Sequence, residues 1–178
     1  MPTRLASPQT PTHAPHAVVR SRASLLADRL QRGARALAEV AGALTEMEWR
    51  MPLPADTRTV GVVVHHVASV YPLEMKLALS VASGVGIIGI TSADLQQIYA
   101  RHSAEYRNIS KKDAIELLRI NSDAAAVGIR TLTDAQLDSA ASISLYADAP
   151  VTCQFLLEDH AVRHSYHHLA QIRAAIGR

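Results

Sequence analysis

The sequence has a single cysteine, Cys153, and few aromatic residues. One cysteine cannot form an internal disulfide, so a reducing cytoplasm is the compartment that the sequence favours. Aromatic residues make up 4% of the chain while hydrophobic residues make up 48%, so the core must be built from Ala, Leu, Val and Ile. Small aliphatic side chains let helices pack closely, which favours a helical domain.

The chain also has no large excess of one sign of charge and no long apolar run. The chain holds 18 basic and 16 acidic residues, and the basic ones are scattered without a stripe, which argues against a nucleic-acid surface. The longest uncharged run, residues 77–93, contains several glycines and is shorter than the roughly 20 residues that a membrane span requires. We therefore expect no nucleic-acid and no membrane partner. We also expect no secretory signal, because prolines interrupt the N-terminal segment.

Apolar residues recur at three- and four-residue steps along most of the chain, which predicts helices. A first helix is expected over residues 19–47 and a second over 57–83, where Pro72 should cause a kink or an interruption. The glycine-rich stretch 84–89 is expected to be a flexible loop. Further helices are expected over 93–107 and 110–131, with a short helical turn after Thr133.

The last helix is expected to begin at Pro150, which suits a first turn, and to end at Ile176 before Gly177. The sequence lacks the alternating apolar pattern that is typical of strands. It therefore predicts an all-α domain over residues 19–178. Residues 1–18 are predicted to be a disordered tail, because they are rich in proline and show no periodicity.

Nine histidines are present, and four of them lie within one stretch of the last predicted helix: His160, His164, His167 and His168. Residues four apart on a helix project from the same face with Cβ atoms about 6 Å apart, so His164 and His168 can bind one ion together. Their stripe is otherwise apolar and faces the core. Buried imidazoles need partners, and a metal ion provides one for each.

A third ligand must come from another element. The only other histidine pair in a predicted helix is His65 and His66, and His66 shares an apolar stripe with Val63 and Val70. Three neutral imidazoles leave at least one coordination position open, as in catalytic sites. A water or thiol bound to the metal ion at that open position would lose its proton more easily. Imidazole ligands suit zinc, nickel, iron or copper, and zinc or nickel is expected here.

Other interpretations of these residues stay open at this point. His160 is also four residues before His164, and the four-residue spacing can arise by chance on a helix surface. His167 fits a surface or supporting position, and His102 fits a surface or core position. A di-iron site is excluded because no Glu has a His three residues later. Haem binding fits a facing pair better than three histidines, and Cys153 is expected to be a buried core thiol.

Two segments resemble those of a known family. Residues 58–69 read Arg-Thr-Val-Gly-Val-Val-Val-His-His-Val-Ala-Ser, and residues 164–172 read His-Ser-Tyr-His-His-Leu-Ala-Gln-Ile. These segments, their order and their separation resemble the DinB-like four-helix-bundle metalloproteins. The resemblance extends over roughly residues 20–177, with a departure at Ala170, where the family often has glycine. Ala is also small, so we expect close helix packing to be kept there.

The resemblance implies an up-down-down-up four-helix bundle with a long crossover. It also implies His66, His164 and His168 as the metal ligands, the same three residues that the stripes favour. Family members often form homodimers through helix faces. Some relatives resemble transferases that add a low-molecular-weight thiol to a small-molecule substrate.

We therefore predict a divalent-metal-binding cytoplasmic protein that acts as a thiol S-transferase or a hydrolase on a small molecule. A non-catalytic metal-binding or ligand-binding stress protein fits the same three histidines. Three residues are candidates to line or support the site, and each also fits a packing or surface position: Tyr71, Glu74 and Tyr166.

Overall fold

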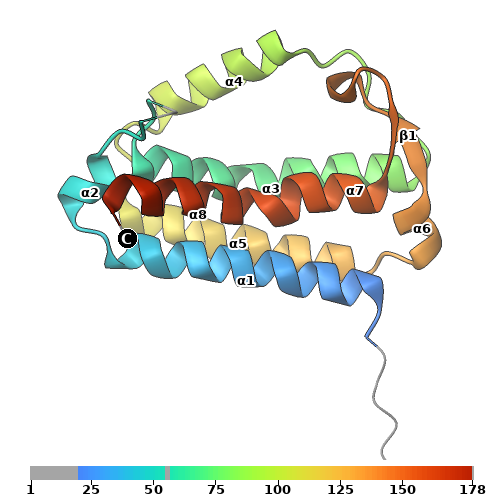
Figure 1. Cartoon of the computed structure of the whole chain (residues 1–178), viewed down its shortest axis with the longest axis horizontal. Helices are drawn as coiled ribbons and strands as arrows, with labels where there is room; N and C mark the ends of the chain where they lie inside the picture. Colours follow the sequence, from blue (N-terminus) through green and yellow to red (C-terminus); the bar gives the residue numbers. More distant parts are fainter. Residues whose placement is uncertain (1–19, 55–56, 178) are drawn as a thin grey trace, which may run out of the picture.

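The computed structural model describes residues 20–54 and 57–177, and most of these residues are helical (Figure 1). The predicted tail, residues 1–18, lies outside the described residues. Three long helices are α1 (Arg22–Ala43), α3 (Val60–Ala82) and α5 (Lys111–Arg130). A fourth helical rod consists of α7 (Cys153–Leu157), a π turn (Glu158–Val162) and α8 (Arg163–Ile176).

These four rods form the predicted bundle. Helix α5 packs against both α1 and α3 on one side, and the α7–α8 rod packs against both of them on the other. Helices α3 and α5 run in the same direction, whereas α1 and the α7–α8 rod run in the opposite direction (Figure 1). The topology is therefore up-down-down-up, as predicted. The crossover from α3 to α5 carries α4 (Ser92–Glu105) along the outside of the bundle.

The first predicted helix is in fact two helices. Helix α1 ends at Ala43, and Leu44 is extended with a ψ of 145°. The Thr45 side chain and the Glu48 carboxylate then form a capping box that starts α2 (Glu46–Arg50). The prediction of one helix to residue 47 is wrong, because the capping box satisfies the free backbone groups at a new helix start.

Helix α3 is uninterrupted at Pro72. Proline has no N–H, so the carbonyl of Ala68 loses its usual partner one turn further along the helix. The side chain of Asn121 on α5 supplies a replacement, since its Nδ2 donates to Ala68 O at 2.8 Å. The predicted interruption is therefore absent, and a neighbouring helix satisfies the carbonyl that the proline leaves open.

The segment after α3 is held by hydrogen bonds. The Ile87 N–H donates to Ser142 O and the Ser144 N–H donates to Ile87 O, both at 2.9 Å. Ile87 is buried, and the turns at either side of it use Gly84 and Gly89 with φ values of +74° and +83°. Residues 84–89, predicted to be a flexible loop, are thus fixed to a distant part of the chain.

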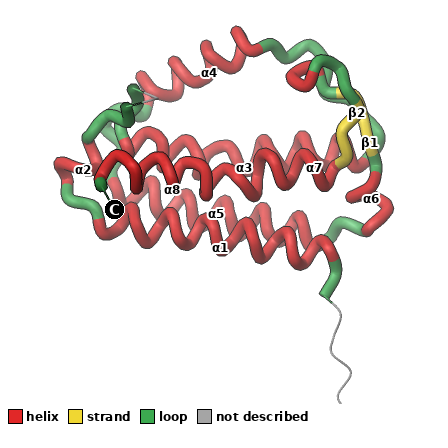
Figure 2. The backbone as a smooth tube through the Cα atoms, viewed as in Figure 1, coloured by secondary structure: helices red, strands yellow, loops and turns green. Residues whose placement is uncertain are grey.

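A two-stranded antiparallel sheet precedes the last helical rod (Figure 2). It pairs β1 (Ala140–Ser142) with β2 (Pro150–Thr152), and a short 3-10 turn (Ser144–Tyr146) lies between them. The prediction that Pro150 begins a helix is wrong, because Pro150 lies in β2 and Thr152 caps α7. Gly177 ends α8 with a φ of +71°, as predicted.

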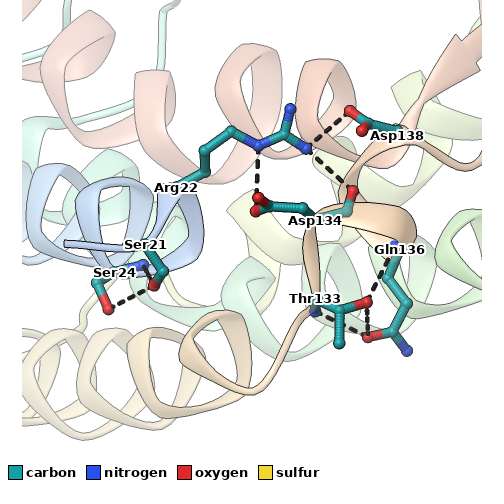
Figure 3. Close-up of polar contacts among 7 residues, drawn as sticks. All are labelled: Ser21, Arg22, Ser24, Thr133, Asp134, Gln136 and Asp138. Carbon is teal, nitrogen blue, oxygen red and sulfur yellow. Dashed lines mark hydrogen bonds and ion pairs between the residues drawn. The ribbon is translucent and has the colours of Figure 1, made fainter. Parts of the chain in front are cut away.

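Polar contacts join the start of α1 to the short helix α6 (Asp134–Asp138) (Figure 3). Thr133 and Gln136 form the predicted capping box of α6. The Arg22 guanidinium donates to the carboxylates of Asp134 and Asp138, at 3.3 and 2.7 Å. Among the described residues, none of the helices combines the length and apolarity needed to cross a bilayer.

Candidate metal centre

His66 on α3 and His164 and His168 on α8 meet in one cluster. Their candidate ligand atoms all lie within 4.8 Å of one another, and Nε2 of His66 lies 3.2 Å from Nε2 of His164. His66 and His168 are buried, and His164 is partly buried. The structure thus brings together the three histidines that the sequence singled out, from the two helices on which they were expected.

The π turn explains why His160 is not in the cluster. In a regular helix His160 and His164 would share a face, but a π turn places one extra residue in the turn between them and rotates the preceding part of the rod. The His160 ring instead lies against Tyr146, with its Nε2 3.0 Å from the phenolic oxygen. His160 therefore belongs to a separate polar contact.

Two acceptors fix the orientation of the α8 imidazoles. Nδ1 of His164 lies 2.7 Å from Oε1 of Glu74, and Nδ1 of His168 lies 2.8 Å from Oε1 of Gln171. Each Nδ1 donates its proton to the acceptor, which leaves a lone pair on Nε2 directed away from it. Glu74 is buried and, as one of the predicted supporting candidates, does contact the cluster.

Burial favours the neutral form of two of the three imidazoles, those of His66 and His168. Removal from water lowers the pKa of His66 to about 2, and the nearby His164 and Arg58 charges act in the same direction. Burial likewise lowers the pKa of His168 to about 3, with the charge of His164 as a further cause. Neutral imidazoles are the form that binds a metal ion. The donor set of three converging imidazole nitrogens therefore fits a divalent transition metal.

A second group of rings, from α3, α4 and the C-cap of α4, lies beside His66. Nδ1 of His65 lies 2.9 Å from Nε2 of His102, and the His65 ring stacks on Tyr106 with centroids 3.9 Å apart. The His102 and Tyr99 rings approach His66 edge-on at 5.6 and 5.2 Å. This role of α4 was not among the sequence-based predictions, although the sequence carries a signal for it. Tyr99, His102 and Tyr106 recur at three- and four-residue steps along α4 and its C-cap.

The remaining predicted residues lie outside the cluster. Tyr71 is buried and its hydroxyl contacts Ser165 Oγ at 2.7 Å, which ties α3 to α8 beside the site. Tyr166 contacts α1 instead, donating to Arg29 O at 3.1 Å.

His167 and Ala170 are exposed, so the alanine at position 170 is not in a closely packed contact. Cys153 is a buried core thiol, and burial raises its pKa to about 11.

No family model and no curated protein matches this chain by sequence. Solved structures do match it. YfiT from Bacillus subtilis, described as "a probable metal-dependent hydrolase with an unusual four-helix bundle topology", superposes with a TM-score of 0.70 at 18% identity, over 93% of this chain and 94% of YfiT. The fold is that of YfiT. The DinB-like bundle predicted from the resemblance is thereby confirmed as a fold.

Two further structures share the YfiT fold. The colibactin self-resistance protein ClbS, solved in complex with double-stranded DNA, matches with a TM-score of 0.67 at 14% identity, over 89% of this chain and 98% of ClbS. An uncharacterized protein from Clostridium difficile 630 matches with a TM-score of 0.67 at 15% identity, over 88% of this chain and 96% of that one. At these identities the likeness to YfiT and to both others concerns the fold alone.

Proposed function

We propose that this protein binds one divalent transition-metal ion through His66, His164 and His168 and uses it as a hydrolase or a thiol S-transferase. The observation that carries the proposal is the orientation of the α8 imidazoles. Both donate through Nδ1 to buried or partly buried acceptors, so that their Nε2 lone pairs and the His66 ring converge. Such acceptors behind imidazole ligands are typical of metal centres.

Three protein ligands leave a coordination position open for a substrate. The ion would supply Lewis acidity there, toward a water or a thiol. The chain itself favours neutral imidazoles at His66 and His168 by burial, and the Glu74 carboxylate accepts a hydrogen bond from Nδ1 of His164. The Tyr99 and His102 rings cover His66 and restrict the access of water to it.

Two observations bear on the reaction class. YfiT, whose fold this chain shares, is described as a probable metal-dependent hydrolase, which supports hydrolysis. A thiol transfer would need a small thiol from solution, because the buried thiol of Cys153 has a raised pKa and stays protonated. A small-molecule substrate suits both reactions. Zinc and nickel are the metals that we propose, since both accept imidazole ligands.

The first test is the metal content of untagged protein purified without chelators or added metal, measured by elemental mass spectrometry. We expect about one equivalent of a transition metal per chain, lost in His164→Ala and His168→Ala and strongly reduced in His66→Ala. His160→Ala and His167→Ala are matched controls that remove histidines of the same rod and should keep the metal. Protein without metal, and without uptake of zinc or nickel on titration, would refute the proposal.

The second test is turnover by the metal-loaded protein. Ester and amide substrates test hydrolysis, and a chromogenic electrophile with a small thiol tests transfer. Activity that disappears in His164→Ala supports an enzyme. Stoichiometric metal with no turnover in either assay would favour a non-catalytic metal-binding protein.

A further inference from the structure

Helix α4 lies over the three-histidine cluster without being packed into the bundle. Every residue of this helix is exposed or partly exposed. A cavity of about 300 Å³ lies between α4 and the residues that lead into α3. The helix stands apart from the four rods of the bundle in Figure 1. Little buried apolar surface therefore holds α4 in its place.

Hydrogen bonds tie the chain to other parts of the molecule on both sides of α4. Before the helix, Ser144 Oγ accepts from the Ile90 N–H at 3.1 Å and donates to the Ile90 carbonyl at 2.8 Å. After the helix, Trp49 Nε1 donates to Ile109 O at 3.1 Å. The segment between these two ties can therefore roll about the line that joins its ends while both ends stay in place.

Ring contacts hold the second half of α4 and its C-cap on α3. His102 Nε2 lies 2.9 Å from His65 Nδ1, and the Tyr106 ring stacks on His65 with centroids 3.9 Å apart. The Tyr99 and His102 rings approach His66 edge-on. With these rings in place His66 is only 4% exposed. A metal ion or a substrate that is to reach His66 therefore needs the rings to move aside.

This closed arrangement leaves one ring nitrogen unsatisfied. His102 Nδ1 is buried and has no hydrogen-bond partner within the described part of the chain. A buried imidazole nitrogen without a partner opposes the packing around it, whereas the same nitrogen is hydrogen-bonded in water. Outward movement of α4 would return this nitrogen to water. The closed state is thus opposed by one of the groups that it buries.

We propose that α4 is a lid that opens and closes over the three-histidine cluster. In the open state its rings leave α3, while the ties at both ends and the four rods of the bundle stay in place. Lids of this kind open in microseconds to seconds and admit the reactants of a covered site. The motion itself needs no metal ion, whereas its role as a gate rests on the proposed metal-dependent function.

The test follows a thiol placed beneath the lid in metal-free protein. Ser69 is partly buried and its Oγ lies 3.4 Å from His102 Nε2, so Ser69→Cys puts a thiol where α4 covers it. The reagent is dithionitrobenzoate, which forms a disulfide with an accessible thiol and releases a coloured thiolate. The buried Cys153 of the same chain is the internal reference, because it becomes accessible when the bundle unfolds.

The thiol of Ser69→Cys should react about tenfold more slowly, or slower still, than that of Ala124→Cys at an exposed position of α5. Adding Tyr106→Ala removes the stack on His65 and should raise the rate of Ser69→Cys about tenfold, as expected for the loss of one aromatic pair. The matched control is Tyr166→Ala, which removes a tyrosine that contacts α1 instead of α3 and should not change the rate.

Three results would overturn the lid. The first is a thiol of Ser69→Cys that reacts as fast as that of Ala124→Cys, since α4 would then not cover it. The second is a rate that Tyr106→Ala leaves unchanged. The third is an equal rise in the reaction of Cys153, because the opening would then be unfolding of the whole bundle. A rise confined to the introduced thiol supports the lid.

The role as a gate has its own measurement, the transfer of zinc from loaded protein to a chelator. Tyr106→Ala should speed this transfer about tenfold, the same factor as for the thiol. Faster labelling with unchanged zinc transfer overturns the gate and leaves the motion. Failure to bind zinc refutes the proposed metal centre and the gate with it, while the thiol measurement still decides whether α4 opens.

Discussion

At the scale of single residues, Glu74 is placed to support the proposed metal centre without being one of its ligands. Its buried carboxylate accepts from Nδ1 of the partly buried His164 at 2.7 Å. Glu74→Ala should weaken metal binding by about 10- to 100-fold, since the imidazole loses both its orientation and its basicity. Glu74→Gln keeps an acceptor oxygen and should lose less. Competition against a chromogenic chelator measures both, and wild-type affinity in Glu74→Ala would contradict this role.

The buried histidines also predict how the metal-free protein responds to acid. The pKa is about 2 for His66 and about 3 for His168 in the folded state, whereas it is about 6.5 in an unfolded chain. The unfolded state therefore takes up protons first as the pH falls below about 6.5, and the free energy of unfolding decreases. Urea denaturation between about pH 7 and about pH 5 should show this decrease.

The matched variant for the acid response is His168→Gln, which removes one of the histidines whose pKa burial lowers. Its free energy of unfolding should fall less steeply with decreasing pH than that of the wild type. An unchanged slope would show that the destabilisation in acid arises elsewhere.

The sequence predicted the three clustered histidines because each lies on an apolar helical stripe. The stripe favoured His168 as the partner of His164, but the spacing left His160 open, and the π turn that turns His160 away could not be predicted. His102 was not recognised because its partner, His65, lies on another helix and sequence spacing gives no information across helices. Glu74 could be named as a candidate, but its contact follows only from how α3 and α8 pack.

At the scale of elements, Pro72 and Asn121 act as a pair through the Ala68 carbonyl. Asn121→Leu should destabilise the protein by about 1–3 kcal/mol, because it leaves this carbonyl without its partner. In a Pro72→Ala background the alanine N–H can donate to the same carbonyl, so the Asn121→Leu substitution should cost much less. Urea denaturation of the four proteins gives the coupling free energy. Strict additivity would contradict this explanation.

Helix packing at Gly61 depends on the absence of a side chain. A Cβ atom there would lie 2.6 Å from Trp49 Cε2, and Trp49 is only 3% exposed and cannot easily move. Gly61→Ala should therefore destabilise the protein by about 1–3 kcal/mol. Gly42→Ala is the control, since its Cβ would meet Ile115 Cδ1 at 3.9 Å, and it should stabilise by about 0.4–1 kcal/mol. Thermal unfolding compares the two, and equal effects would contradict the argument.

Helix existence followed from apolar periodicity, but several boundaries did not. Leu44 continues the apolar pattern of α1, and only its extended backbone and the capping box of Thr45 end the helix. The hairpin of β1 and β2 has three residues in each strand, too few for an alternating pattern to appear. Its pairing depends on a turn that includes Ala147 and Asp148 at positive φ, which the sequence did not indicate.

At the scale of the whole molecule, α4 differs from the helices of the bundle. None of its residues is buried, whereas most of α3 is. The amides of α4 should therefore exchange with deuterium much faster than those of α3 and α5. Metal loading should slow exchange in α4, because Tyr99 and His102 rest on His66, and α5 serves as the internal reference. Equal protection of α4 and α5 without metal would contradict this prediction.

The order and direction of the helices followed from the family resemblance and could not be obtained from periodicity, which does not show which helices are neighbours. The crossover carrying α4 is what makes α3 and α5 parallel (Figure 1). The division into a tail and a domain over 19–178, and the homodimer expected from the resemblance, stay predictions. Analytical ultracentrifugation of the untagged chain would measure the oligomeric state.

The contact between Asn121 and the Ala68 carbonyl also predicts the order in which asparagine 121 and proline 72 evolved. An ancestor with a residue other than proline at position 72 would lose little stability by acquiring asparagine at 121. Proline at 72 without that asparagine would leave the Ala68 carbonyl without a donor, and selection would act against the loss of stability. The neutral change should thus have come first and permitted the other. Among homologous sequences, proline at 72 should be accompanied by a hydrogen-bond donor at 121 more often than the reverse.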